Sequence, residues 1–209
     1  QTNMDLKKPL ILNQSKLGKY SSIVQKNIKD IPPEYRVAHE LAVVALTSKQ
    51  CNEPYEILLS DVLDVMDVKQ KHGWDALDNL ENPTEFYEYK PSSNATNPSG
   101  TINDDTLVKI EKCEKIYQEG KKGWLVLAGI DKTNYSFNCV YKFPLEIYNE
   151  DRRSYLSALM EKNKVQTKQT RSTYSITIKK SINLCTKFGK EYYVWQGERS
   201  SPLPPPEKM

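Results

Sequence analysis

Residues 74–90 read WDALDNLENPTEFYEYK, and the rest of the expected fold is arranged around them. Two short apolar–polar alternations flank the run 79–84, whose Asn and Pro residues favour a turn. Successive side chains of a strand point to opposite faces, so Glu88 and Lys90 share one face. A hairpin here would bring Asp75 close to that face. Two carboxylates and one ammonium would then meet at the end of a strand.

This combination of charges suits metal-dependent chemistry on phosphate. Paired carboxylates supply the anionic oxygens that Mg²⁺ prefers, and Mg²⁺ keeps positions for water and phosphate. Such a metal can polarise a phosphoryl oxygen and activate a water molecule, while a lysine offsets the developing charge. A solvated hairpin with alternating charges would show the same pattern, so these residues alone leave both interpretations open. Asp78 lies three residues from Asp75, on the opposite face, and Glu85 is off the face of Glu88, so we expect both to be only solvated.

The segment resembles the PD-(D/E)xK nuclease superfamily, and more narrowly the PvuII-type restriction endonucleases. That family carries Asp-Ala-x-Asp-Asn, a turn, and then Glu-Tyr-Glu-x-Lys-Ser. Here residues 75–79 read DALDN, and residues 85–92 read EFYEYKPS after a longer turn. The resemblance implies Mg²⁺ as cofactor, Asp75 and Glu88 with Tyr89 as its ligands, and Lys90 as the catalytic lysine.

The implied function is that of a type II restriction endonuclease in a restriction-modification system, which hydrolyses phosphodiester bonds in double-stranded DNA. Such enzymes are homodimers that read palindromes. Because one site cuts one strand, a two-strand break by a small protein also favours a two-fold dimer. Two alternatives remain. One is another PD-(D/E)xK nuclease, such as a junction resolvase, a repair nicking enzyme or a transposase subunit. The other is an inert DNA-binding or inhibitor protein.

The polar stretch 91–103 follows the motif and suits either a mobile surface loop or a base-reading segment. Asn can bind adenine with two hydrogen bonds, and Ser or Thr can contact several base edges. The PvuII type has a histidine run at this place, and no histidine occurs here. The recognised DNA sequence therefore does not carry over. The candidate base-reading residues are Asn94, Asn97, Thr101 and Asn103.

Charge is segregated along the chain, although the net charge is only +3. Acidic residues gather between 61 and 88, whereas residues 162–190 contain eight basic residues and no acid. A solvated face gives such a run too, but DNA binding needs this asymmetry. The residues that we expect to contact phosphate are Lys162, Lys164, Lys168, Arg171, Lys179 and Lys180.

With 209 residues the chain suits one domain. We expect an α/β fold, a mixed central sheet flanked by helices, and the resemblance implies a restriction-endonuclease-like core. Residues 1–199 would form one nuclease domain, with a mainly helical dimerisation or support region at 14–72 and the catalytic, DNA-reading core at 73–199. A Pro-rich tail follows at 200–209. The expected helices are 15–30, 34–49, 53–71, 104–119 and 144–162, and the expected strands beyond the motif are 123–130, 137–143, 172–179 and 191–195.

For two of these helices we also predict which face is buried or exposed. The apolar face of 34–49, with Val37, Leu41 and Val44, is interpreted as core rather than as a dimer surface. The Asp residues of 53–71 are interpreted as its solvated face.

The remaining features of the sequence bear on the cellular compartment of the protein and on the classes of enzyme that it could belong to. Four single cysteines without a Cys-x-x-Cys pair argue against zinc and favour a reducing, cytoplasmic compartment. No apolar run reaches the length of a membrane span, and the first residues do not resemble a signal peptide. Because the sequence starts at Gln1, we expect the native chain to begin earlier. The chain has no glycine-rich phosphate loop and no Gly-x-Ser-x-Gly, which argues against nucleotide hydrolases and serine esterases.

Overall fold

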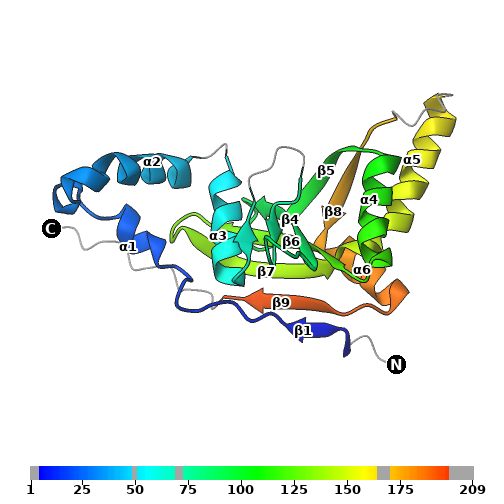
Figure 1. Ribbon diagram of the computed structural model, residues 1–209, viewed down its shortest axis with the longest axis horizontal. Helices are drawn as coiled ribbons and strands as arrows, with labels where there is room; N and C mark the ends of the chain where they lie inside the picture. The colour runs from blue at the N-terminus through cyan, green and yellow to red at the C-terminus, as the bar shows by residue number, and fades with distance from the viewer. Residues whose placement is uncertain (1–4, 49–50, 69–72, 164–169, 198–209) are drawn as a thin grey trace.

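The computed structural model describes residues 5–48, 51–68, 73–163 and 170–197 (Figure 1). Its strands are β1 (Lys7–Pro9), β2 (Met66–Asp67), β3 (Ala76–Leu77), β4 (Glu85–Ser92), β5 (Ser99–Asp105), β6 (Lys122–Asp131), β7 (Ser136–Pro144), β8 (Ser172–Thr177) and β9 (Tyr192–Gln196). Seven of them form one sheet in the order β1-β9-β7-β6-β4-β3-β2. The pairs β4–β6 and β1–β9 are parallel and the others antiparallel. The predicted mixed central sheet is confirmed.

The other two strands, β5 and β8, form a separate antiparallel pair. This pair lies outside the main sheet, and β5 passes beside β4. The stretch 91–103 was expected to be a loop, and that expectation was wrong for most of it. Strand β4 continues to Ser92 and β5 begins at Ser99, which leaves only residues 93–98 as a connection.

The core lies on both faces of the sheet, as β6 shows. Because strand side chains alternate, its residues enter two different apolar clusters. Trp124 and Val126 pack in the cluster under α3 (Glu53–Leu63), whereas Leu125 and Leu127 pack in the cluster on the opposite face. A strand buried on both faces has the continuous apolar sequence that predicted it.

The second face is covered by helices from the C-terminal half. These are α4 (Leu107–Gln118), the 3₁₀ helix η4 (Leu145–Tyr148), α5 (Asn149–Asn163) and α6 (Ile178–Phe188). Side chains of α4, η4 and α6 enter the same cluster, namely Cys113, Leu145 and Cys185. Helices α4 and α5 fit the predictions. Helix α6 was not predicted, although Thr177 caps its start by accepting a hydrogen bond from the Lys180 amide.

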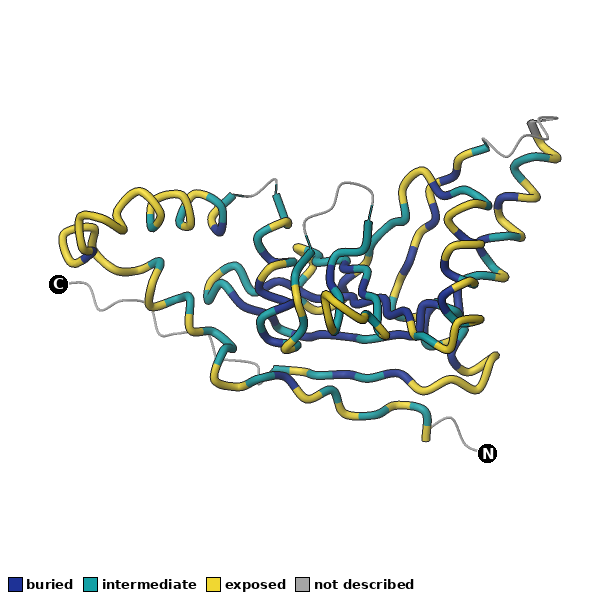
Figure 2. The backbone as a smooth tube through the Cα atoms, viewed as in Figure 1, coloured by how far each residue is buried: buried dark blue, intermediate teal, exposed yellow. Residues whose placement is uncertain are grey.

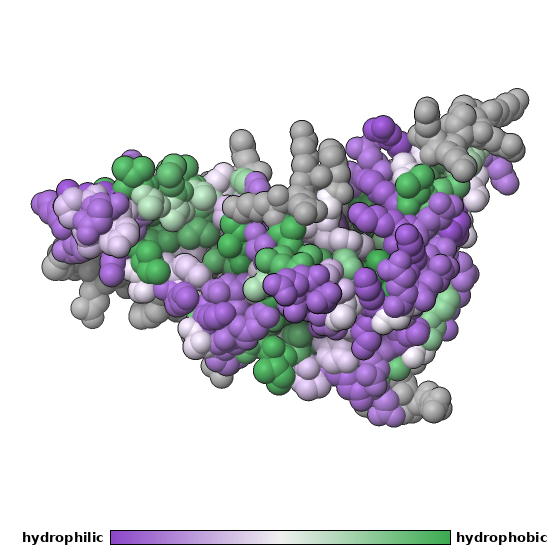
Figure 3. All heavy atoms as spheres, in the orientation of Figure 1, coloured by the Kyte–Doolittle hydropathy of each residue, from purple (hydrophilic) through white to green (hydrophobic). Residues whose placement is uncertain are grey.

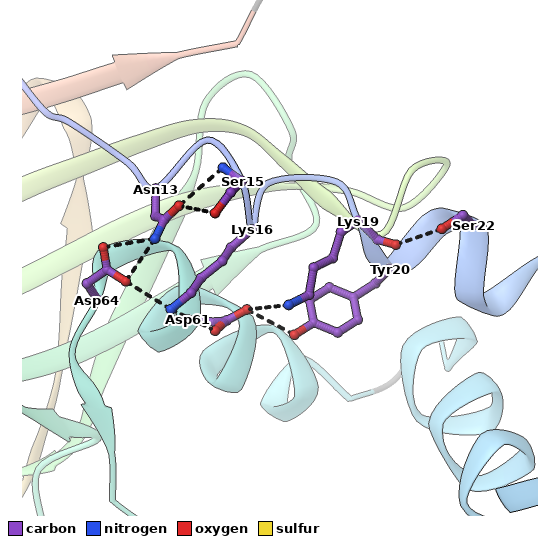
Figure 4. Close-up of polar contacts among 8 residues, drawn as sticks. All are labelled: Asn13, Ser15, Lys16, Lys19, Tyr20, Ser22, Asp61 and Asp64. Carbon is purple, nitrogen blue, oxygen red and sulfur yellow. Dashed lines mark hydrogen bonds and ion pairs between the residues drawn. The ribbon is translucent and has the colours of Figure 1, made fainter.

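The N-terminal helices form an arm that extends away from the sheet (Figure 1). They are α1 (Tyr20–Val24), η2 (Ile28–Asp30), η3 (Pro33–Tyr35) and α2 (Arg36–Thr47), so the single helix expected at 15–30 is largely replaced by turns and short pieces. The segment before α1 is fastened to α3 by polar contacts (Figure 4). Lys16 lies 2.9 Å from Asp64 and 3.4 Å from Asp61, and the Tyr20 hydroxyl donates to Asp61 at 2.9 Å. Asp61 and Asp64 therefore anchor this segment. Asp64 is exposed, as expected for a solvated face, whereas the Asp61 side chain is only 26% exposed.

The apolar face of α2 was interpreted as core, and this was wrong. Val37, Leu41 and Val44 are 70%, 67% and 63% exposed. Figure 2 shows α2 mostly in the exposed colour, and Figure 3 shows apolar side chains gathered over this part of the molecule. The helix itself is where the sequence predicted it.

Three smaller differences concern single elements. The helix predicted over 53–71 ends at Leu63, because Asp64 adopts the left-handed conformation (φ 54°) and the chain then enters β2. The N-terminal segment, for which no strand was predicted, contains the edge strand β1. The predicted tail at 200–209 lies outside the described residues. Among the helices that the structure describes, none combines the length and apolar character needed to cross a bilayer.

Candidate active site

Strands β3 and β4 form the hairpin that the motif predicted. The amide of Asp75 donates to the carbonyl of Tyr87 at 2.9 Å, and the amide of Tyr89 donates to Asp75 Oδ2 at 2.6 Å. The Asp75 carboxylate is therefore bonded to the backbone of the strand that carries Glu88 and Lys90. The three residues of the motif are neighbours in the structure.

The two faces of β4 have different environments. Tyr87 and Tyr89 are buried in the cluster beneath α3, where the Tyr89 hydroxyl is hydrogen-bonded to Ser60 at 3.0 Å. Glu88 and Lys90 lie on the other face and form an ion pair of 2.9 Å. Their side chains are 28% and 20% exposed, so the pair is shielded but open to a ligand.

The Asp75 carboxyl lies in a region of crowded negative charge. Burial raises the pKa of Asp75 to about 6, and the charge of Glu88 adds to the shift, whereas the Tyr89 amide and Lys90 oppose it. A cation placed beside Asp75 and Glu88 would offset the burial and the neighbouring negative charge that raise the pKa of Asp75. This is the electrostatic condition expected of a divalent metal site.

Sequence reasoning missed a third carboxyl group, Glu56 on α3. Burial, followed by the charge of Asp75, raises the pKa of Glu56 to about 7; Lys90 opposes this shift and Glu88 adds to it. Its only local signal is that it lies one helical turn before Ser60, the partner of Tyr89. This spacing points to a place near the site only once α3 is known to cross β4.

Lys90 is held from its other side by Gly100 on β5. A Cβ atom at Gly100 would lie 2.7 Å from Cβ, 2.8 Å from Cγ and 3.0 Å from Cδ of Lys90. Real Cβ contacts are almost never that short, so a larger residue at position 100 would force Lys90 to move. The sequence predicted neither this contact nor the path of β5.

Next to Glu88 and Lys90 lies a cavity of about 300 Å³ between β4, β5 and α4. Asn103, a candidate base-reading residue, lines it together with two lysines of α4, Lys109 and Lys112. Sequence reasoning had assigned no role to either lysine. The cavity is therefore continuous with the candidate catalytic residues and has a basic rim.

The candidate base-reading residues divide between the connection and β5. Asn94 serves the turn itself, since its side chain accepts a hydrogen bond from the Asn97 amide at 3.1 Å. On β5 the Thr101 hydroxyl donates to the Asn103 side chain at 3.2 Å. Asn94, Asn97 and Asn103 are exposed, and Thr101 is half-buried.

The candidate phosphate contacts of the C-terminal third lie away from the cavity. Lys162 is exposed near the end of α5, Lys179 is exposed at the start of α6, and Arg171 lies 3.8 Å from Asp104 at the surface. Lys180 donates to the Ser175 carbonyl at 2.6 Å. None of these four lines the cavity beside Lys90. Lys164 and Lys168 lie outside the described residues.

Asp78 and Glu85 were expected to be solvated, and the structure contradicts both expectations. Asp78 closes the turn by accepting hydrogen bonds from the amides of Thr84 and Glu85 and from the Thr84 hydroxyl, at 2.9, 3.0 and 2.6 Å. Glu85 accepts hydrogen bonds from the Tyr87 hydroxyl and the Trp124 indole, both at 3.2 Å. They stabilise the hairpin, so neither is a neutral control in mutagenesis.

The residues present could hold a divalent cation, but they supply only a few ligands. Asp75 and Glu88 supply carboxylate oxygens, and Tyr89 can offer only its main-chain carbonyl because its hydroxyl is bonded to Ser60 on the far face. In the described part of the chain, no three His, Cys, Asp or Glu side chains form a metal-binding cluster. Further ligands would be water or the phosphate itself, which suits Mg²⁺.

Comparison of the chain with protein-family models, curated proteins and solved structures finds no match. Any function must therefore be argued from the motif, the geometry of the site and its charges.

Proposed function

We propose that the protein is a Mg²⁺-dependent endonuclease of the type II restriction kind, with a PD-(D/E)xK core, that cleaves double-stranded DNA. The observation that supports this most is the meeting of Asp75, Glu88 and Lys90 at one end of a hairpin, beside a cavity with a basic rim. An inert DNA-binding protein has no need of two half-buried carboxylates beside each other.

Each residue of the candidate site has a defined part in this proposal. Asp75 and Glu88 hold the cation, with the Tyr89 carbonyl as a further ligand. When bound, Mg²⁺ supplies polarisation of the phosphoryl oxygen and lowers the pKa of a water molecule. The Tyr89 amide orients the Asp75 carboxylate at 2.6 Å. Lys90, positioned by Glu88 and Gly100, places its ammonium where negative charge develops on the phosphate.

DNA reading is assigned to β5 and to the connection before it. Asn97, Thr101 and Asn103 present amide and hydroxyl groups of the kind that read base edges, whereas Asn94 shapes the turn. Lys162, Arg171, Lys179 and the other basic residues of the C-terminal third supply charge for the DNA backbone farther from the site.

We infer a homodimer, in which the exposed face of α2 packs against a second copy. Val37, Leu41 and Val44 form an apolar stripe on one helix face, and their exposure would cost free energy in a monomer. Two sites related by a two-fold axis would cut both DNA strands. We also propose a reducing, cytoplasmic compartment, as expected from the four single cysteines of the sequence.

One experiment separates this function from its alternatives. The protein is incubated with plasmid DNA or with synthetic four-way junctions in Mg²⁺, in Ca²⁺ and in EDTA. Discrete plasmid fragments in Mg²⁺, with weak cleavage in Ca²⁺ and none in EDTA, are expected. Cleavage of junctions alone would indicate a resolvase, and DNA left intact by the Mg²⁺ sample would indicate a binding protein. Full activity in EDTA would contradict the assignment of the site.

A further inference from the structure

The cavity beside Glu88 and Lys90 has features that the motif does not explain. Its volume of about 300 Å³ is at the lower end of ligand-binding sites. One wall is β4 with the candidate catalytic pair, and the opposite wall is α4 with Lys109 and Lys112. A ligand in this cavity would therefore touch both the catalytic residues and α4.

The positive charge of α4 is not neutralised within the cavity. Lys90 is paired with Glu88 at 2.9 Å, and the buried Arg152 is paired with Asp105 through two bonds of 2.7 and 2.8 Å. Lys109 and Lys112, by contrast, form no ion pair with any residue that the structure describes.

The neighbours of these two lysines are neutral. Lys109 Nζ donates to the main-chain carbonyl of Asn103 at 3.0 Å, and Lys112 Nζ lies 5.6 Å from the centre of the Trp74 ring. Two ammonium groups thus face the cavity without a counter-charge, which favours an anionic ligand.

The lining also has an apolar part. Trp74 is half-buried and packs against Phe86, with 5.4 Å between ring centres. Leu145 and Cys113 form part of the floor. A free inorganic anion would gain nothing from an indole wall. A phosphate joined to a sugar would use both halves of the cavity, because the sugar presents carbon-bound hydrogens to the ring.

We propose that this cavity binds the sugar–phosphate unit adjoining the cleaved bond of the DNA strand. Lys109 and Lys112 contact its phosphate, and Trp74 contacts its sugar. The two lysines are three residues apart on α4, so they lie on the same face of the helix. This inference rests on the proposed function. It moves the phosphate contacts nearest the cleaved bond from the C-terminal third of the chain to α4.

The chain offers a matched control in Lys115. It is the next lysine of the same row on α4, but it does not line the cavity and is paired with Glu119 at 3.9 Å. The experiment compares Lys112→Met, Lys109→Met and Lys115→Met. Affinity for a random-sequence DNA duplex is measured in Ca²⁺ between 50 and 200 mM salt. Thermal unfolding of each variant shows whether it is folded.

Loss of one phosphate contact should flatten the plot of log affinity against log salt by about 0.9. We expect this flattening for Lys112→Met and Lys109→Met, and an unchanged slope for Lys115→Met. DNA should also change the tryptophan fluorescence of the wild-type protein, and Trp74→Phe should remove that change. Equal slopes for Lys112→Met and Lys115→Met would overturn the inference. The proposed function has a separate test. It fails if the wild-type protein leaves DNA uncut in Mg²⁺, whatever the salt slopes of the variants are.

Discussion

Gly100 lies against the aliphatic part of Lys90, so closely that a Cβ atom at position 100 would be 2.7 Å from Lys90 Cβ. The two residues belong to different sheets, since β5 pairs with β8 and β4 pairs with β3 and β6. The strand assigned to DNA reading thus touches the lysine assigned to catalysis. A shift of β5 on binding DNA would therefore change the position of the Lys90 side chain.

Gly100→Ala should slow cleavage without weakening DNA binding. The added methyl group must displace Lys90, and an error of about 1 Å in a catalytic group can cost ~100-fold in rate. We expect kcat to fall by roughly 10- to 100-fold while KM changes little. Ser99→Ala, an exposed neighbour on the same strand, is the control. A folded Gly100→Ala protein with unchanged kcat would show that the contact has no part in catalysis.

Glu56 predicts how the metal-free protein depends on pH. Its folded-state pKa of about 7 lies above the ordinary value of 4.5, so the folded state binds its proton more tightly than the unfolded state. This contribution to stability is complete below pH 4.5 and is lost as pH rises through 7. We expect the melting temperature in EDTA to fall between pH 5 and pH 8, and Glu56→Gln to reduce that fall. Glu53→Gln, on the same helix but exposed, should reduce it much less, because its charge is the smallest of the causes that raise the pKa of Glu56.

Arg152 and Asp105 predict a large cost when their buried pair is broken. Both side chains are almost fully buried, so Arg152→Ala leaves an uncompensated carboxylate in the core. This should lower the free energy of unfolding by about 3–5 kcal/mol. Arg153 is its neighbour on α5 and pairs with Glu114 at the surface, so Arg153→Ala should cost at most about 1 kcal/mol. Urea unfolding measures both values. Similar losses for the two variants would contradict the burial argument.

The α2 face predicts the oligomeric state. Leu41→Glu places a charge in the middle of the exposed apolar stripe and should convert a dimer into monomers, as measured by sedimentation velocity. Ala42→Glu, which is turned away from the stripe, should leave the dimer intact. A wild-type protein that sediments as a monomer at micromolar concentration would refute this use of α2.

The sequence predicted the parts of the site that depend on local pattern. Alternation along β4 placed Glu88 and Lys90 on one face, and the turn at 79–84 returned the chain toward Asp75. Glu56 and Gly100 could not be predicted, because each depends on where a distant element crosses β4. Asp78 was misjudged because a carboxylate that closes a turn and a solvated one look alike in sequence.

The same distinction applies to the fold. The continuous apolar run of β6 predicted a buried strand from its own residues. The periodicity of α2 predicted a helix with an apolar face, but not what covers that face, because burial is decided by the packing of other elements. Helix α6 was missed because the alternation of β8 ends at Thr177, which is itself the cap of the helix.

The assignment of the site is tested by measuring cleavage and binding for the same variants. Asp75→Ala, Glu88→Ala and Lys90→Ala should each lose cleavage by ~100-fold or more in Mg²⁺. Without metal, the two carboxylate variants should bind DNA as tightly as wild type or more tightly, because a repelling charge is gone, whereas Lys90→Ala should not gain affinity. Glu81→Ala, in the exposed turn, should cleave normally. Near wild-type cleavage by any of the first three variants would contradict the assignment.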